Sequence, residues 1–179
     1  ALAIYENLGN RQQQGRVLRE IGNLQYKQEH YQTALDYMQK ALILAYQTED
    51  IVILPMTNNE IAKLYIQIGD DSKALNALYE ALRLSKMEHD GDIREQSVTH
   101  QLLADSYVRQ HRFDSAYVHL KAYYELREEL LDKEKSERIN ELEIAYQSQQ
   151  KELENTQLRD HNRTIYNQYL LLFTTSVVL

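Results

Sequence analysis

Two short apolar patterns separated by one glycine constrain the fold of this chain more than any other feature. They lie at residues 61–82, IAKLYIQIGDDSKALNALYEAL. In the first half, apolar residues recur at helical spacing, namely Ile61, Leu64, Tyr65 and Ile68. Gly69 and the two aspartates after it interrupt the pattern, because glycine accepts a left-handed turn and aspartate caps a following helix. The second half has its own apolar stripe, Ala74, Leu75, Leu78, Ala81 and Leu82, so the stretch predicts a helical hairpin.

Two other stretches repeat this pattern. Residues 18–42 align with it through Ile21, Gly22, Tyr31, Ala34, Met38 and Ala41. Residues 100–126 align through Leu103, Ala104, Tyr107, Phe113, Ala116, Leu120 and Tyr123. One hairpin cannot bury its apolar face alone, so the recurrence predicts an all-α solenoid of stacked helical pairs.

These residues resemble the tetratricopeptide repeat (TPR), with a small residue at the helix crossing, an aromatic residue at the turn and small residues along the second helix. The resemblance covers Ala1 to about Leu126. The chain departs from the pattern at Gln25, Asp71 and Tyr123, and its repeats are 40 and 42 residues apart instead of the usual ~34. The additional residues predict longer helix ends or loops between repeats. Long-period repeats of this kind are common in bacterial regulators, so the resemblance favours a role in signalling.

The pattern divides the chain into six segments. Residues 1–14 are predicted to be the second helix of a truncated repeat, residues 15–54, 55–96 and 97–126 to be TPR repeats, residues 127–164 to be a long charged helix, and residues 165–179 to start a transmembrane helix. Both ends fall inside a helical or apolar pattern, so we expect the sequence to be part of a longer chain.

Composition narrows the function. The 179 residues include one proline and no tryptophan, and the net charge of −7 argues against a basic nucleic-acid-binding face. The absence of cysteine excludes disulfides and thiol catalysis. We find no glycine-rich phosphate loop, nucleophile elbow or kinase signature, so no catalysis and no cofactor is expected from this stretch. Among the six histidines, His111 and His119 could share a neighbourhood, but no third metal ligand accompanies them.

In tetratricopeptide repeats the first helix of each pair lines an inner groove. By that resemblance the groove would carry Arg16, Arg19, Asn23, Tyr26, Lys27, Asn59, Lys63, Gln67, Gln101, Asp105 and Arg109. Arg19 and Asn23 match positions that hold the C-terminal carboxylate of a peptide in chaperone-binding members, whereas Asn59 lies one place away from its counterpart. The functional interpretation is a groove for an extended or helical peptide, bound through basic and amide groups. The alternative is a solvated polar face without a ligand.

The helix predicted after the repeats has no glycine or proline for about forty residues. Its apolar residues alternate in steps of three and four, with the seam Ile139, Leu142, Tyr146 and Leu153 interrupted by Gln149. This spacing predicts a parallel homodimeric coiled coil. The alternative is a solvated single helix.

The last residues, YLLLFTTSVVL at 169–179, form an uncharged stretch shorter than the ~18–20 residues that span a bilayer. Tyr166 and Tyr169 lie where an interfacial aromatic belt would be, so we expect the start of a transmembrane helix. The alternative is a hydrophobic helix that folds back on the repeats.

The order of repeats, charged helix and hydrophobic segment resembles the input half of bacterial membrane-anchored sensor histidine kinases and helix-turn-helix regulators. That resemblance implies a protein or peptide ligand, repeats in the periplasm, attachment to the inner membrane, and an output module, such as a histidine kinase, after Leu179. The alternative is a soluble cytoplasmic scaffold, such as a co-chaperone-like adaptor or a peptide-pheromone receptor. A catalytic protein that uses the repeats only for docking would need a separate domain.

Overall fold

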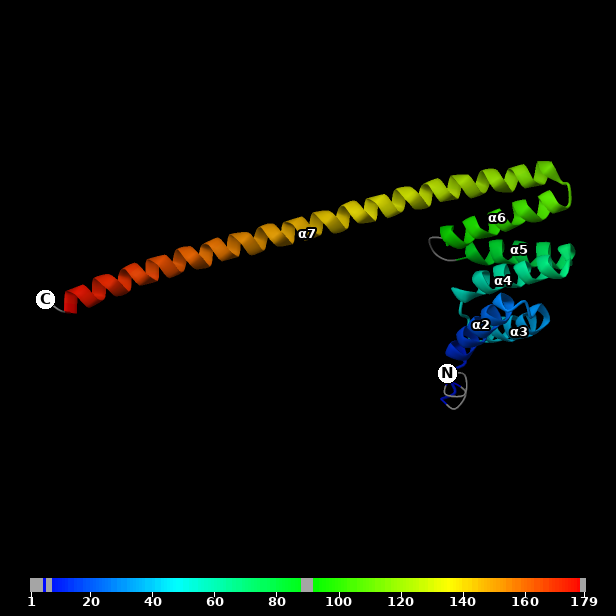
Figure 1. Cartoon of the computed structure of the whole chain (residues 1–179), viewed down its shortest axis with the longest axis horizontal. Coiled ribbons are helices and arrows are strands. Elements are labelled where there is room, and N and C mark those ends of the chain that lie inside the picture. Colours follow the sequence, from blue (N-terminus) through cyan, green and yellow to red (C-terminus); the bar gives the residue numbers. More distant parts are fainter. Residues whose placement is uncertain (1–4, 6–7, 88–91, 178–179) are drawn as a thin grey trace. The chain divides into compact units, whose positions relative to one another are not determined.

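A computed structural model describes residue 5, residues 8–87 and the backbone of residues 92–177, with side chains placed to residue 168. The chain forms two compact units, residues 1–130 and 131–179. The described part contains helices α2 (Arg11–Lys27), α3 (Tyr31–Gln47), α4 (Ile53–Ile68), α5 (Asp71–Ser85), α6 (Ile93–Arg109) and α7 (Phe113–Val177), which runs through both units (Figure 1). Residues 1–4 and 6–7 lie outside the described residues, so the truncated first repeat stays a prediction.

The repeat unit is an all-α, TPR-like solenoid, as the sequence predicts. Helix α2 pairs with α3 and α4 pairs with α5, and α3 and α5 each contact the helix that follows (Figure 1). In the central hairpin, Gly69 has φ 85° and the Asp70 side chain accepts a hydrogen bond from the Lys73 backbone N–H, at 3.1 Å. Both turn roles inferred from the sequence are therefore confirmed.

All three hairpin turns use one backbone conformation, although only the central turn contains glycine. Glu29 and His111 have φ 63° and 57° at the positions that correspond to Gly69. In each turn the next backbone N–H bonds back to a carbonyl in the last turn of the preceding helix: His30 to Gln25, Asp70 to Tyr65 and Arg112 to Tyr107, at 3.0, 2.9 and 2.9 Å. This shared termination gives each second helix the same start relative to its first helix.

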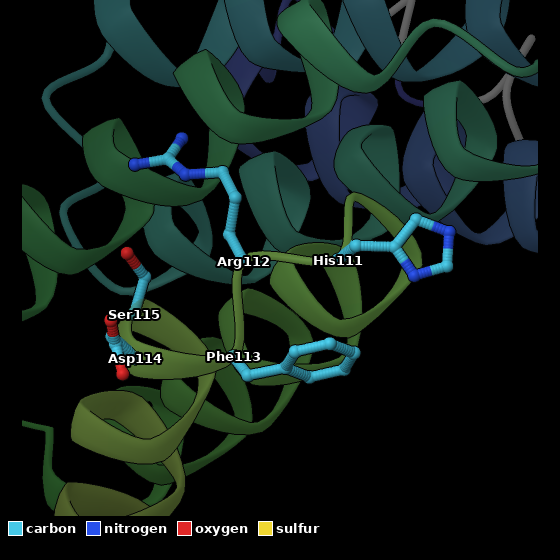
Figure 2. A pocket seen from close by; sticks show the side chains of 5 residues that line it. All are labelled: His111, Arg112, Phe113, Asp114 and Ser115. Carbon is cyan, nitrogen blue, oxygen red and sulfur yellow. The ribbon is translucent and has the colours of Figure 1, made fainter.

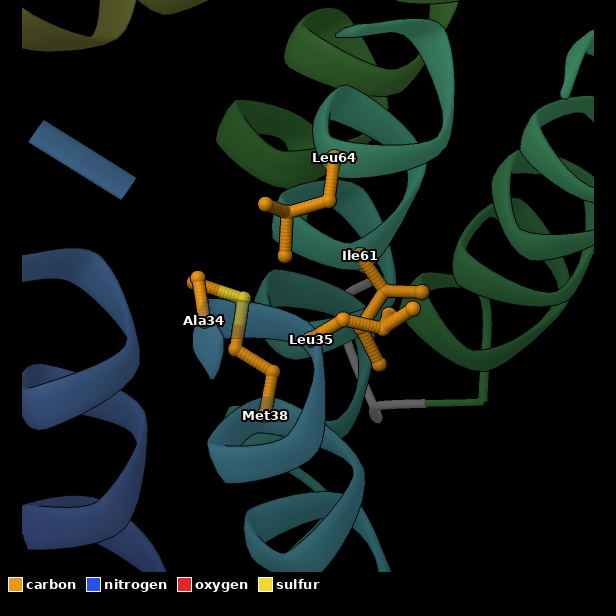
Figure 3. Close-up of a cluster of buried hydrophobic side chains, with 5 residues drawn as sticks. All are labelled: Ala34, Leu35, Met38, Ile61 and Leu64. Carbon is orange, nitrogen blue, oxygen red and sulfur yellow. The ribbon is translucent and has the colours of Figure 1, made fainter. Parts of the chain in front are cut away.

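Small residues hold the paired helices together where the sequence predicts. Ala34 and Ala74 are fully buried and Ala116 is 5% exposed. A Cβ atom on Gly22 would lie 2.7 Å from Met38 Cγ and 3.2 Å from the Ala34 carbonyl oxygen, so α2 and α3 cross at a distance that only glycine fits without a shift. Figure 3 shows the core next to this crossing, where Ala34, Leu35 and Met38 meet Ile61 and Leu64.

The first helix of each pair begins before the predicted repeat boundary. Helices α2, α4 and α6 begin at Arg11, Ile53 and Ile93, so the predicted repeat boundaries at residues 15, 55 and 97 all fall inside helices. In the joint between α3 and α4, residues 48–52 are not helical and the residues from Ile53 belong to α4, so a loop and a helix end share the additional length.

In the second unit α7 continues from residue 131 to Val177. The side chains of residues 131–168 are all exposed, including those of the predicted seam. A search of the described residues finds no helix that is both long and apolar enough to cross a membrane. Residues 178 and 179 of the predicted membrane segment lie outside the described residues.

Candidate functional site

The predicted groove residues lie on the first helices α2, α4 and α6, but the structure gives them different roles. Some join neighbouring repeats, some line a pocket, and some are exposed without contributing to it.

Two asparagines donate hydrogen bonds to glutamates on the next first helix. Asn23 Nδ2 on α2 donates to Glu60 Oε1 on α4 at 2.8 Å, and Asn59 Nδ2 on α4 donates to Glu95 Oε2 on α6 at 3.0 Å. Asn59 Oδ1 also accepts from the Thr99 hydroxyl at 3.0 Å. Burial raises the pKa of both glutamates, while the hydrogen bonds from the asparagines act in the opposite direction. We call these two contacts, which occupy different positions of the repeat, the asparagine–glutamate ladder.

Asn59 is therefore a structural residue in this conformation. It is only 2% exposed and has its hydrogen-bonding partners inside the protein, so it presents no surface to a ligand. The family position suggested an accessible amide, but Asn59 lies one place away from that position. On a helix this shift turns the side chain by about 100° toward the neighbouring repeat.

The two arginines also make internal contacts. Arg16 Nε lies 3.0 Å from Asp50 Oδ2, and the Asp50 side chain is only 2% exposed. Arg16 thus neutralises a buried carboxylate between α3 and α4. Arg19 is 14% exposed, with its guanidinium 2.6 Å from Glu20 and 3.9 Å from Glu60. These ion pairs leave the arginines less available to a ligand than their positions suggested.

The second group lines a pocket of about 190 Å³ between α2, α3 and α4. Its lining consists of Asn23, Tyr26, Lys27, Met38, Glu60 and Lys63. Four of these six residues were predicted as groove residues from the repeat pattern, whereas Met38 and Glu60 were not. We call this the α2–α4 pocket.

The α2–α4 pocket combines an apolar wall with charged groups. Tyr26 packs against Tyr31, with ring centroids 5.8 Å apart, and Met38 is 1% exposed. Glu60 Oε2 is buried and accepts no hydrogen bond among the described residues, although Glu60 Oε1 is held by Asn23. The pocket therefore holds in one lining two lysines and a carboxylate that pairs with Arg19 at 3.9 Å, an arrangement suited to a polar ligand group.

The remaining predicted residues do not line this pocket. Gln67 is exposed near the end of α4, and Gln101, Asp105 and Arg109 are exposed on α6. They stay candidates for contacts with a longer ligand that extends along the first helices.

The structure also brings together a polar cluster that the sequence did not reveal. His119 pairs with His100 instead of His111, with the two Nδ1 atoms 3.0 Å apart. His119 stacks on Tyr107 at 5.5 Å, and Tyr107 shares a hydrogen bond with Tyr79 at 2.7 Å. Helices α5, α6 and α7 each contribute to this histidine–tyrosine cluster. The spacing of these four residues in the chain gives no indication that they meet.

Burial explains the titration behaviour of this cluster. Desolvation and the neighbouring His119 lower the pKa of His100 to about 4, and desolvation lowers the pKa of His119. Burial and the hydrogen bond to Tyr107 raise the pKa of Tyr79 to about 12. Both histidines are thus neutral at pH 7. Among the described residues no three histidine, cysteine or acidic side chains are grouped to hold a metal ion.

A further depression, of about 330 Å³, surrounds the turn between α6 and α7. Figure 2 shows that its side chains diverge: His111 and Phe113 extend to one side of the turn, whereas Arg112 and Ser115 lie on the other. The Arg112 guanidinium lies over the Tyr107 ring, 4.5 Å from the ring centroid. Because its polar groups do not converge, this depression is a weaker binding site than the α2–α4 pocket.

Comparisons with known proteins support the fold. The sequence matches no protein-family model, and no curated protein matches it. Among solved structures, the chain is similar to the crystal structure of MamA, with a TM-score of 0.54 and 16% sequence identity over 73% of this chain and 77% of MamA. At this identity the similarity establishes a shared TPR-like architecture.

Proposed function

We propose that this chain is a non-catalytic domain that binds a protein or peptide partner along its first helices. The α2–α4 pocket carries the proposal, because it combines an aromatic and apolar wall with two lysines and a glutamate. A pocket of this composition anchors one residue of a partner and adds orientation through charge.

The lysines determine which partner fits. Lys27 and Lys63 border the pocket on two different helices, so a carboxylate placed between them gains two charge-assisted hydrogen bonds. We therefore favour an extended segment with an acidic side chain or a free C-terminal carboxylate.

Within this function, we favour a role as the sensory input region of a bacterial signalling protein. The long helix α7 after the repeats supports it, because two such helices paired at the Ile139–Leu153 seam could carry a change in the repeats to an output module. A ligand shifts such an equilibrium only by its different affinity for the two states. Attachment to the inner membrane, with the repeats in the periplasm, belongs to this proposal. A cytoplasmic scaffold of the adaptor or pheromone-receptor kind is the second candidate, because the α2–α4 pocket can bind a partner without an output module.

A peptide selection tests the binding site directly. We would select random decapeptides displayed on phage against the protein and measure the best binders by calorimetry. The double variant Lys27→Ala/Lys63→Ala should bind them at least about tenfold more weakly, equivalent to ~1.4 kcal/mol. The matched control Lys40→Ala/Lys133→Ala removes the same charge from exposed positions away from the pocket and should bind normally. Equal loss in both variants, or no loss in either, would show that the α2–α4 pocket is not the binding site.

A further inference from the structure

The first turns of α7 carry an apolar stripe on the repeat unit. It consists of Phe113, Tyr117, Leu120 and Tyr124, which are 62%, 68%, 41% and 63% exposed. We call these four residues the α7 stripe. Figure 2 shows its first member, Phe113, with the ring directed away from Arg112 and Ser115. Large apolar side chains grouped this way on one helix face indicate an interaction site more often than scattered ones do.

The stripe is separate from the face that holds α7 to the repeats. On that face Ala116 is 5% exposed, His119 contacts His100 on α6, and Tyr123 is half-buried. This face thus holds helix α7 to the repeats, while the stripe residues stay exposed. The stripe is therefore a second apolar face, which the described part of the repeat unit does not cover.

The spacing of the stripe indicates what kind of surface would cover it. Its residues are separated by four, three and four positions, which is the heptad spacing of helices that pair side by side. In such pairs each seam residue of one helix inserts into a hole formed by four residues of the other. The stripe has such a hole, because Tyr117, Leu120, Lys121 and Tyr124 line a depression of about 350 Å³ together with Glu125 and Glu128.

We propose that the α7 stripe binds the same stripe of a second copy of this chain, with the two helices parallel and in register. In that arrangement Leu120 of one copy enters the hole around Leu120 of the other. Each stripe residue meets its own counterpart, and none of the four is charged, so no like charges are brought together.

The charges beside the stripe favour this occupant over a charged foreign partner. One edge of the α7 stripe, which we call the outer edge, carries the exposed residues Asp114, Lys121 and Glu128. Their charges alternate in sign every seven residues, so the outer edge has no single charge that would attract a strongly basic or acidic segment. Along the inner edge the corresponding residues are Ala116 and Tyr123. In a parallel pair Lys121 then faces Ala116 and Glu128 faces Tyr123 of the other copy, and neither contact is repulsive.

The C-terminal end of the α7 stripe is also compatible with pairing. The next heptad position holds Arg127, whose guanidinium donates to the Tyr123 hydroxyl at 2.7 Å and lies 6.0 Å from the centre of that ring. The Arg127 charge is directed toward the inner edge, away from the α7 stripe. This proposal concerns the repeat unit alone and is independent of the seam at Ile139–Leu153.

Single-cysteine cross-linking of the full chain tests the proposal, because the natural sequence has no cysteine. Leu120→Cys places a thiol in the stripe, and the matched control Val118→Cys places one two residues away, at a position that is 63% exposed. Under mild oxidation we expect Leu120→Cys to form disulfide-linked dimers at least about tenfold faster. Random collisions would instead favour Val118→Cys, which is the more exposed site, so equal rates or a faster control would overturn the proposal.

Repeating the experiment with Leu142→Asp added separates this interface from the coiled-coil seam. If the stripe pairs by itself, the preference for Leu120→Cys persists in that background. If the preference disappears, the stripe does not self-associate and the proposal is wrong, while the seam retains its support. A double variant Tyr117→Glu/Tyr124→Glu should abolish the cross-link in both backgrounds, and circular dichroism checks that its helices remain folded.

Discussion

Asn23 on α2 donates a 2.8 Å hydrogen bond to Glu60 on α4 and thereby joins the first helices of two successive repeats. Asn59 on α4 donates to Glu95 on α6 at 3.0 Å and joins the next two first helices. The ladder thus gives the buried Asn59 and the two partly buried glutamates hydrogen-bond partners inside the fold. Each amide satisfies a carboxylate that burial would otherwise destabilise.

Asn59→Ala should destabilise the protein by about 1–3 kcal/mol, because the partly buried Glu95 carboxylate loses the amide that donates to it. Gln101→Ala, at an exposed position of α6, should change the free energy of unfolding by less than about 0.5 kcal/mol. Urea unfolding followed by circular dichroism measures both. Similar values for the two variants would mean that the ladder contributes no stability.

Gly22→Ala should destabilise the protein although alanine is the better helix former by about 1 kcal/mol. The added Cβ would lie 2.7 Å from Met38 Cγ, inside a packed crossing, and such overpacking typically costs about 1–3 kcal/mol. Gly15→Ala is the matched control on the same helix, where the nearest atom is Leu44 Cβ at 3.3 Å. Thermal melting should therefore rank Gly22→Ala below Gly15→Ala, and the reverse order would show that the crossing has room to relax.

Stability should fall as the pH drops from about 6.5 toward 4, because of the histidine–tyrosine cluster. His100 has its pKa lowered from 6.5 to about 4 by burial and by His119, so in this window the unfolded chain binds more protons than the folded protein. One such group contributes at most about 1.4 kcal/mol per pH unit. Lys86 adds to the effect, and Tyr79, Tyr107 and the Arg112 guanidinium are the other polar groups that face the pair.

Glu60 and Glu95 act in the opposite direction, since burial raises the pKa of each carboxyl and so favours its protonated form in the folded state. A comparison of variants removes this contribution. His100→Gln should lose less stability between pH 7 and pH 5 than the parent, whereas His161→Gln, an exposed histidine of α7, should behave like the parent. Urea midpoints at the two pH values give the answer, and identical pH profiles for all three proteins would exclude His100 as the source.

Leu142→Asp should weaken any dimer formed through the second unit by more than tenfold, because it places a charge in the middle of the predicted seam. Ile144→Asp is the matched control, since Ile144 is 68% exposed and lies outside that seam. Sedimentation equilibrium of the full chain measures the dissociation constants. An equal effect of both substitutions would show that the register of the seam is wrong.

The hairpin architecture could be predicted from the sequence because it depends on local and repeated features. Gly69 and Asp70 mark a turn by their own conformational preferences. Ala34, Ala74 and Ala116 recur at matching positions, and each is buried at a helix contact. Apolar periodicity, turn chemistry and small residues all act within a few turns of helix, so a single sequence contains enough information to predict them.

The accessible part of the groove could not be predicted in the same way. Asn59 and Lys63 are both polar residues on α4, yet one is buried in the ladder and the other lines the α2–α4 pocket. Glu60, which the repeat pattern did not single out, belongs both to the ladder, through Asn23, and to the lining of the α2–α4 pocket. The difference arises from packing between helices whose residues are more than thirty positions apart, and the polarity of a residue does not report it.

The amino-acid sequence was enough to predict the helical pairs, the positions of their turns and the small residues that allow them to stack. The folded structure was needed to show which polar side chains join the repeats, which remain open to a partner, and that His100 meets His119. Helix formation and turns depend on neighbours along the chain, whereas burial, hydrogen-bond partners and pKa values depend on neighbours in space.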